Sequence, residues 1–404
     1  MTTIDIKRKV RLITLIGTLL HKYGTNAPRL EASLKDISNT LGLDGNFFST
    51  PTYLALSIES DDEQINRHIR IPPGDTNLSM LQEVDTIAMD VCNGNVEIEE
   101  AISKLKLLET PQSLYSSTAI ILAYGLTSSA LSVLLSGGIN EVTISLLLGI
   151  ILGLLSLLKS KNDKMADIFE FTAAFLIMFT SYFIHSFYPY FNYQNVLISG
   201  LIVIIPGLAI TIAMSELATK NLVSGTARLM GALIEFFKIS FGVLLGLELG
   251  KMVFAPITTF ATIKLPSYFE IPAICIASFC FTIIFQARRK DFPIILMSGL
   301  ITFFSLKVSS YFLNQILSLF VASFMIGILS NLFARIKNRP SAIILVPGII
   351  FLVPGSVGLK GLNLILQNNF IQGLSDGFQM FTLTITIVGG LFLANIMLNP
   401  RKHL

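Results

Sequence analysis

Two proline–glycine pairs are the residues of this chain with the clearest potential for binding chemistry. Pro206-Gly207 and Pro354-Gly355 each lie inside an apolar run about as long as a membrane span. Proline removes a backbone donor and clashes with the preceding helical turn. In lipid, the carbonyl that is freed must find a partner in protein, water or a solute. Such breaks at matching places in the two halves of a membrane protein therefore indicate a site for a polar solute.

Residues beside the two breaks complete the candidate binding site. The hydroxyls of Thr211 and Ser356 can hydrogen-bond a solute, although a bond back to a helix carbonyl is an equally good interpretation. Pro347 precedes Pro354 by seven residues and so shares its helix face. The alternative for the prolines is a set of plain kinks that shape the bundle. The candidate substrate-binding residues are Pro206, Gly207, Thr211, Pro347, Pro354, Gly355 and Ser356.

Five charged residues lie in or beside apolar runs. Ionisable groups inside a membrane are costly, and they commonly mark ion or proton pathways. Glu216 and Arg228 flank one loop and are candidates for a gate, with solvated helix ends as the alternative. Glu235 and Lys238 are candidates for proton coupling, or a neutralising i, i+3 pair. The gating and proton-coupling candidates are Glu216, Arg228, Glu235, Lys238 and Glu170.

Several classes of site are missing from the sequence. It contains no GxxxxGK[ST] phosphate loop, no HExxH and no GxSxG. Its three cysteines show no metal-ligand spacing, and no basic run is long enough for a nucleic-acid surface. We therefore expect no metal, no cofactor, no nucleic-acid partner and no enzymatic activity.

Composition indicates the class of protein that positions these residues. The chain is 52% hydrophobic and 14% charged, with a mean hydropathy of +0.69, which is typical of an integral membrane protein. Residues 1–114 are more polar and predict a small soluble α+β domain of the order ααββαα. Its expected elements are helices 4–22, 27–41, 77–92 and 97–109 and strands 52–59 and 66–71.

Ten membrane spans are predicted after this domain. They are 116–136, 140–158, 167–187, 195–217, 229–250, 270–287, 292–309, 315–334, 341–358 and 377–397. Five spans in each half would give the halves, 115–250 and 251–404, opposite orientations. The fold class is thus mainly α, with two inverted five-helix repeats behind the soluble domain.

Loop charges predict how the chain is oriented. With the N-terminal domain inside, the inner connections carry thirteen basic residues, Arg401 and Lys402 among them, against four in the outer ones. This asymmetry places both termini in the cytoplasm.

The chain resembles the threonine/serine exporter family over almost its whole length, and several stretches carry the resemblance. They are LHKYGTNAPRLEASLKDISNTLGL (20–43), Ser-Gly-Gly (136–138), FEFTAAF (169–175), IIPGLAITIAMSELATKNLVSGTAR (204–228) and VPGIIFLVPGSVGL (346–359). Glu216 and Arg228 match family positions, although the family acid is commonly Asp. Arg29, Glu31 and Arg70 also match recurring positions, as a salt-bridge network or as a regulatory or substrate-handling site. The resemblance implies a fused two-module form, a cytosolic N-terminal domain and efflux driven by the proton motive force.

The function expected first is secondary active export of threonine and serine across the plasma or inner membrane. Split relatives are implicated in dicarboxylate efflux, so a succinate-like dicarboxylate remains an alternative substrate. A membrane-embedded enzyme, or a sensor or scaffold using the N-terminal domain, is an alternative of another class. The partners expected are the small-molecule substrate, protons and membrane lipid, and a homo-oligomer is compatible with the sequence.

Overall fold

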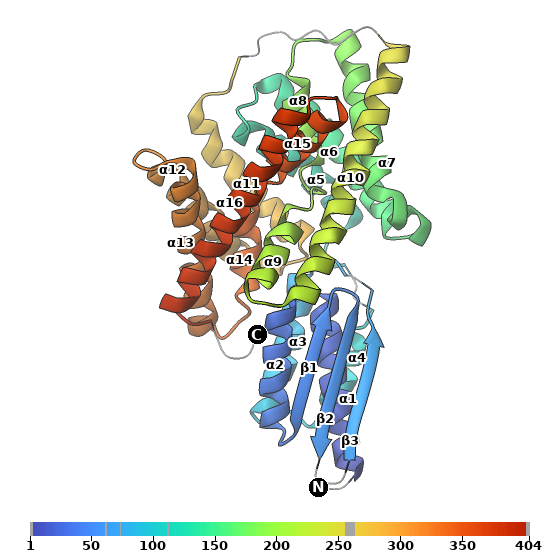
Figure 1. Ribbon diagram of the computed structural model, residues 1–404, viewed down its shortest axis with the longest axis vertical. Helices are drawn as coiled ribbons and strands as arrows, with labels where there is room; N and C mark the ends of the chain where they lie inside the picture. Colours follow the sequence, from blue (N-terminus) through green and yellow to red (C-terminus); the bar gives the residue numbers. More distant parts are fainter. Residues whose placement is uncertain (1–2, 61–62, 73, 111–112, 255–262, 401–404) are drawn as a thin grey trace.

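The computed structural model describes residues 3–60, 63–72, 74–110, 113–254 and 263–400. The basic residues Arg401 and Lys402 lie outside the described residues. Figure 1 shows a small domain of helices and strands at the N-terminus, standing against one end of a long helical bundle. We call the bundle end next to this domain proximal and the opposite end distal.

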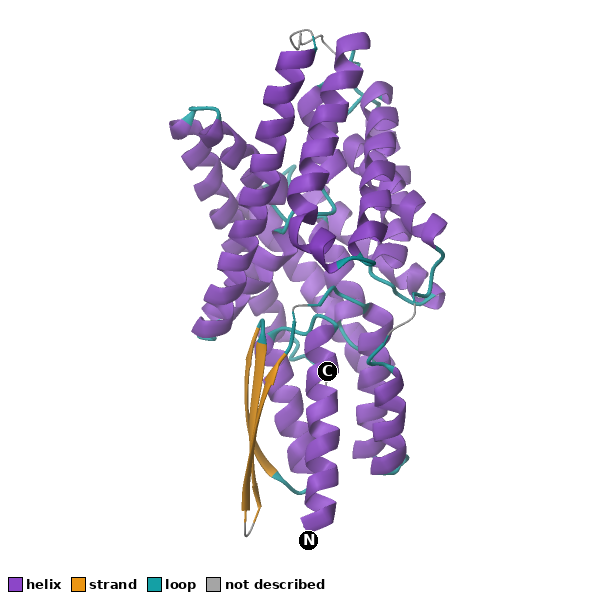
Figure 2. Ribbon diagram, turned by 90° about the vertical axis from the view of Figure 1, so that its right-hand side faces the viewer, coloured by secondary structure: helices purple, strands orange, loops and turns teal. Residues whose placement is uncertain are grey.

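The N-terminal domain is a three-stranded sheet with four helices on one face (Figure 2). The sheet is antiparallel in the order β1-β2-β3. Its core is formed by fully buried aliphatic side chains such as Leu12, Ile16, Leu34 and Leu54. The elements are α1 (Thr3–Lys22), α2 (Ala27–Thr40), β1 (Asp44–Thr50), β2 (Tyr53–Ser60), β3 (Glu63–Arg70), α3 (Leu78–Cys92) and α4 (Ile98–Leu107).

The predicted order ααββαα was wrong by one strand. The sequence of β1, DGNFFST, lacks alternating apolar residues, and the residues it buries are Gly45 and Ser49. It is a strand because it pairs with β2 along its whole length, from Asp44 opposite Glu59 to Thr50 opposite Tyr53. Tertiary pairing therefore decides its structure against a weak local preference.

The bundle contains twelve α-helices among the described residues. They are α5 (Ser117–Leu134), α6 (Ile139–Lys159), α7 (Asp163–Phe187), α8 (Tyr193–Leu201), α9 (Gly207–Ala218), α10 (Leu222–Val253), α11 (Glu270–Ile284), α12 (Phe292–Ser309), α13 (Gln315–Lys337), α14 (Ala342–Ile350), α15 (Gly355–Leu366) and α16 (Phe370–Met397). Eight helical segments are long and apolar enough to cross a membrane, and the pair α14–α15, bent by 42°, would make a ninth. The chain is thus a mainly helical, multi-pass membrane protein.

The fourth and ninth predicted spans are each broken into two short helices. The fourth becomes α8 and α9, and the ninth becomes α14 and α15, with Pro206 and Pro354 as the N-caps of the second pieces. The last helix begins at Phe370, several residues before the predicted start of the tenth span at 377.

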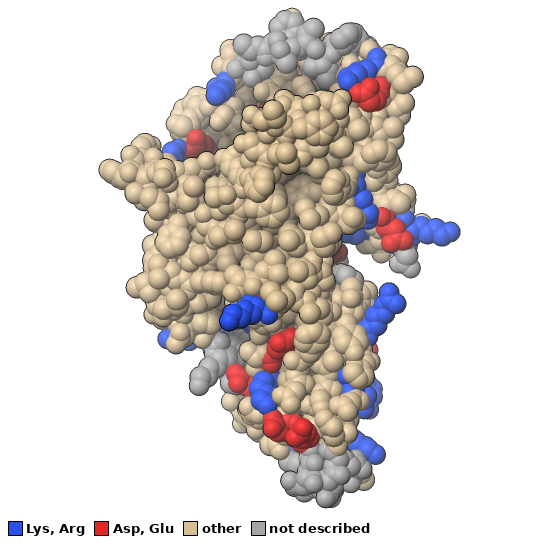
Figure 3. All heavy atoms as spheres, in the orientation of Figure 1, with Lys and Arg blue, Asp and Glu red and all other residues tan. Residues whose placement is uncertain are grey.

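Glycines allow α7 and α10 to approach closely. A Cβ at Gly242 would lie 2.4 Å from the Phe171 carbonyl oxygen, and one at Gly246 would lie 2.8 Å from that of Phe175. In lipid no hydrophobic effect drives two helices together. Small residues at this spacing stabilise the pair instead, because they allow close van der Waals contact. On the face drawn in Figure 3, a broad middle part of the bundle carries almost no charged side chains, as expected of a surface that faces lipid.

The start of α3, in the N-terminal domain, is hydrogen-bonded to the end of the bundle helix α11. The backbone amides of Leu78 and Ser79, at the start of α3, donate to the carbonyls of Phe285 and Gln286 at the end of α11, at 3.0 and 3.2 Å. Unpaired donors of one helix start thereby satisfy acceptors at another helix end. Gln286 also accepts from the amide of Leu114, in the connection to α5.

Candidate functional site

The two helix breaks meet each other inside the bundle. Gly207 and Gly355 are buried, and a Cβ built on Gly207 would lie 3.3 Å from Cα of Gly355 and 2.1 Å from a methyl of Val353. A Cβ on Gly355 would lie 2.7 Å from a methyl of Ile205. Backbone therefore packs against backbone at this crossing, which only glycine permits.

Helices α9 and α15 both begin at this crossing and run in opposite directions. Helix α9 ends beside the N-terminal domain, where Glu216 accepts from Ala27, whereas α15 ends at the distal side with α8. Figure 1 shows α9 low and α15 high in the bundle. The first backbone N–H groups of a helix have no partner within it, and the helix dipole makes that end positive. The crossing thus joins two positive helix ends, a setting that favours a negatively charged group.

The other residues predicted beside the breaks take different environments. The Thr211 hydroxyl is buried and donates to the Gly207 carbonyl at 3.1 Å, which is the intrahelical alternative considered for it. Pro347 is buried within α14, and Ser356 is half-buried in the first turn of α15. Their part in binding stays a prediction.

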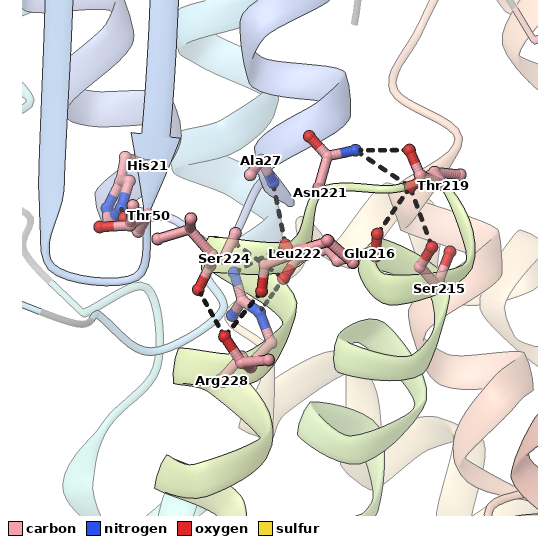
Figure 4. A network of polar contacts seen from close by, with 12 residues as sticks. His21, Ala27, Thr50, Ser215, Glu216, Thr219, Asn221, Leu222, Ser224 and Arg228 are labelled. Carbon is pink, nitrogen blue, oxygen red and sulfur yellow. Dashed lines mark hydrogen bonds and ion pairs between the residues drawn. The ribbon is translucent and has the colours of Figure 1, made fainter.

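Glu216 and Arg228 form an ion pair at the proximal end, in which the Arg228 side chain is 25% exposed. Arg228 donates from Nε to Oε2 of Glu216 at 3.1 Å and from Nη2 to Oε1 at 3.2 Å. The Ser224 hydroxyl donates to Oε2 at 2.9 Å, and the amide of Ala27 donates to Oε1 at 3.1 Å (Figure 4). The side chain of Glu216 is fully buried. Two-point contact from a guanidinium is the strongest form of such a pair.

The fourth donor brings the N-terminal domain into the site. Ala27 is the first residue of α2, so its amide is one of the unpaired donors at a helix start, and the dipole of α2 favours the carboxylate of Glu216. A backbone amide carries no signature in a sequence, and this contact was not predicted. Ser224 was quoted only as part of the motif ending in Arg228, and its place one turn before that residue is the signal that could have singled it out.

The same domain is fastened to the second half of the bundle. Arg29 donates to the Ser341 hydroxyl, just before α14, at 2.6 Å. Arg339 donates to both Gln82 of α3 and the buried Asp291, each at 2.6 Å. The N-terminal domain therefore bridges the proximal ends of both halves. Asp291, Arg339 and Gln82 were not predicted, because they are far apart in the sequence and belong to no local motif.

The remaining charged candidates lie on α7 and α10, and none of them is a hydrogen-bond partner of Glu216 among the described residues. Lys238 lies 3.4 Å from Glu170 and donates to the Asp167 carbonyl at 2.9 Å. Lys238 thus contacts α7. Glu235 is half-buried. A proton-coupling role for Glu170, Glu235 and Lys238 stays a prediction.

Acidification should loosen the N-terminal domain. His21 lies 2.7 Å from the Thr50 carbonyl, and burial lowers its pKa below 6.5, with Arg228 adding to the effect and Thr50 opposing it. The unfolded chain then binds the proton first, so this contribution to stability is complete above pH 6.5 and is lost as the pH falls below that value. Thermal unfolding of the purified protein between about pH 8 and pH 5 should show a slope that His21→Gln reduces. His68→Gln, at an exposed histidine, is the matched control, and an unchanged slope in His21→Gln would contradict the prediction.

Comparison with known proteins identifies two modules in this chain. Residues 11–250 and residues 270–397 each match a family model described as threonine/serine exporter. No solved structure matches the chain.

Curated relatives cover the chain almost completely. It is 26% identical to the pheromone-regulated membrane protein 10 of Debaryomyces hansenii, over 98% of the chain and 42% of the relative. Proteins of the same name in Kluyveromyces lactis and Eremothecium gossypii are also 26% identical over 98% of the chain, which spans 44% and 57% of them. The chain thus spans about half the length of these relatives. By both family models, the chain belongs to the threonine/serine exporter family of membrane transporters.

Proposed function

We propose that this protein is a secondary active exporter of small polar metabolites, with threonine and serine as first substrates. The observation that carries the proposal is the crossing of Gly207 and Gly355, where α9 and α15 start back to back. The two positive helix ends would receive the carboxylate of an amino acid. Pro206 and Pro354, with Thr211, Ser356 and Pro347 nearby, would line the rest of the site.

Corresponding elements of the two halves support an inverted repeat of ten spans. Helices α9 and α15 have 12 residues each, and Gly355 follows Gly207 by the same 148 positions by which Phe370, the start of α16, follows Leu222, the start of α10. The left-handed residues Lys220 and Asn368, just before α10 and α16, are separated by the same number. We infer halves at 115–250 and 251–404 after a domain at 1–114.

The basic residues of the connections support an orientation with both termini in the cytoplasm of a plasma or inner membrane. In this orientation the proximal end is the inner mouth. The Glu216–Arg228 pair would then be an inner gate that the N-terminal domain holds shut through Ala27. Its opening during each cycle, with protons handled by Glu216 or by Glu170, Glu235 and Lys238, would couple efflux to the proton motive force.

A succinate-like dicarboxylate is the second candidate substrate. The same crossing favours it, because two positive helix ends, rather than one, face each other at Gly207 and Gly355. An amino acid would place one carboxylate there and leave the second helix end to a hydroxyl or water.

Transport should need the proton gradient and not ATP. The purified protein in proteoliposomes should export radiolabelled threonine or serine when a proton gradient is imposed, and an uncoupler should lower the initial rate at least ~10-fold. Succinate run in parallel decides between the two substrates. Liposomes with a protein in which Gly355 is replaced by leucine provide the background. Export that persists with all gradients collapsed, or that requires ATP, would overturn the proposal.

A further inference from the structure

A second ion pair joins α15 and α16 near the distal end of the bundle. Nζ of Lys360 lies 3.6 Å from Oδ2 of Asp376, and Gln372 donates to Oδ1 of the same residue at 2.9 Å. Asp376 is 4% exposed, whereas the side chain of Lys360 is 55% exposed. Oδ2 of Asp376 is buried and has no hydrogen bond within the described residues. A buried carboxylate in a largely apolar helix, with one of its two oxygens lacking a hydrogen bond, is costly and therefore indicates a functional role.

Asp376 occupies the place in the second half that Arg228 occupies in the first, whereas Lys360 lies one helical turn before Leu364, the counterpart of Glu216. Asp376 follows Pro354 by the same 22 positions by which Arg228 follows Pro206. The hairpins around the pairs are also built alike, since Gly225 packs on Leu217 and Gly373 packs on Ile365, at the same separation. In each half an ion pair thus ties the helix that follows the break to the next long helix. The polarity is reversed, because the acid lies on α9 in the first half and on α16 in the second.

A pocket opens beside the distal pair. It is partly open to the outside, with a cavity volume of about 60 Å³, and its lining includes Lys360, Asn363 and Gln367 of α15 and Gln194 and Leu197 of α8. The lining therefore combines an ammonium and three carboxamides with apolar side chains. Such a mixture suits a small polar molecule that carries a carboxylate.

We propose that Lys360 and Asp376 form the outer gate of the transporter, opened by the carboxylate of the exported solute. This inference rests on the proposed function. Glu216 has four donors, so the proximal gate is firmly closed. Asp376 holds Lys360 without a hydrogen bond, so a carboxylate arriving in the pocket can take the ammonium over with little loss. Once Lys360 pairs with solute, α15 and α16 are no longer tied and the distal mouth opens.

Cysteine labelling tests the gate without requiring transport. Leu197 is 5% exposed and lines the pocket, so Leu197→Cys reports its opening in a background where Cys92, Cys275 and Cys280 are replaced by serine. A membrane-impermeant maleimide is applied from the side opposite the N-terminal domain. Asp376→Asn and Lys360→Gln should each raise the labelling rate about 10-fold, which corresponds to about 1.4 kcal/mol in the opening equilibrium. Threonine or succinate should raise the rate in the parent protein and have no further effect in Asp376→Asn.

The exposed pair Lys251–Glu248, on a neighbouring helix, provides the matched control. Lys251→Gln should leave the labelling rate unchanged. An equal rise in Lys251→Gln, or no rise in Lys360→Gln, would overturn the proposal, and the latter variant removes an exposed group and so tests it even if Asp376→Asn fails to fold. A gate that responds in labelling while neither threonine nor succinate is transported would support the gate and refute the substrates.

Discussion

Glu216→Gln should slow efflux at least ~100-fold, the largest effect that we expect from a single charge. Removing one partner of a buried ion pair costs about 3–5 kcal/mol, because the other charge is left without compensation. Here the amide carried by glutamine at position 216 would also face the guanidinium of Arg228, donor against donor. In the proposed orientation these contacts hold the inner mouth closed, so their loss should leave the cycle without a defined inward-closed step. Initial efflux rates from proteoliposomes measure the effect.

A double-mutant cycle separates gating from a helix-end role. Arg228→Gln should be similarly slow, and the double variant should be little worse than either single one. Defects that simply multiply would refute the gate. Exchange of the two charges should not restore efflux, because the amide of Ala27 and the hydroxyl of Ser224 both require an acceptor at position 216. The exposed pair Lys251–Glu248 is the control, since pairs of this kind contribute under ~1 kcal/mol.

Gly355→Leu should abolish efflux while the protein still reaches the membrane. Even a Cβ at this position would lie 2.7 Å from a methyl of Ile205 and close to Gly207, so a leucine must push the two helix breaks apart. Overpacking of this kind costs about 1–3 kcal/mol, and it acts on the backbone groups that we assign to the solute. Pro354→Ala should also reduce efflux, because it lets the helix continue across the break. Substrate flux and membrane-fraction abundance are measured together.

Gly377→Leu is the matched control for Gly355→Leu. Gly377 also lies in a helix, and a Cβ there would meet nothing within 4 Å. Its replacement should leave efflux near normal and gain up to about 1 kcal/mol of helix propensity. Normal transport by Gly355→Leu, or an equal loss in Gly377→Leu, would remove the crossing as the solute site.

Local signals explain which parts of this architecture were predictable. A proline–glycine pair within an apolar run is visible without any structure, and both breaks occur where they were expected. The long helices were found because 20 apolar residues have few alternatives in a protein. Strand β1 was missed because its order comes from pairing with β2 and not from its own residues. Around Glu216, only the two charged side chains were predicted, because the contribution of Ala27 is a backbone amide from a distant helix.

Asp376 was missed for a different reason. The tenth span was predicted from residue 377, so Asp376 fell just outside it. In the structure α16 begins at Phe370, so Asp376 lies two turns inside a helix and is buried. A polar stretch at the start of a span can thus belong to the helix, and its acid can be buried against a basic residue of the neighbouring helix.

The junction of α3 and α11 makes the position of the N-terminal domain depend on that bundle helix. Because the amides of Leu78 and Ser79 are bonded to the carbonyls of Phe285 and Gln286, just after α11, we expect a tilt of α11 to shift α3 with it. Ala27 and Arg29 hold the same domain to other parts of the bundle, so the shift should also load those contacts. A distance probe between β3 and a fixed bundle helix would then read the transport cycle from outside the lipid.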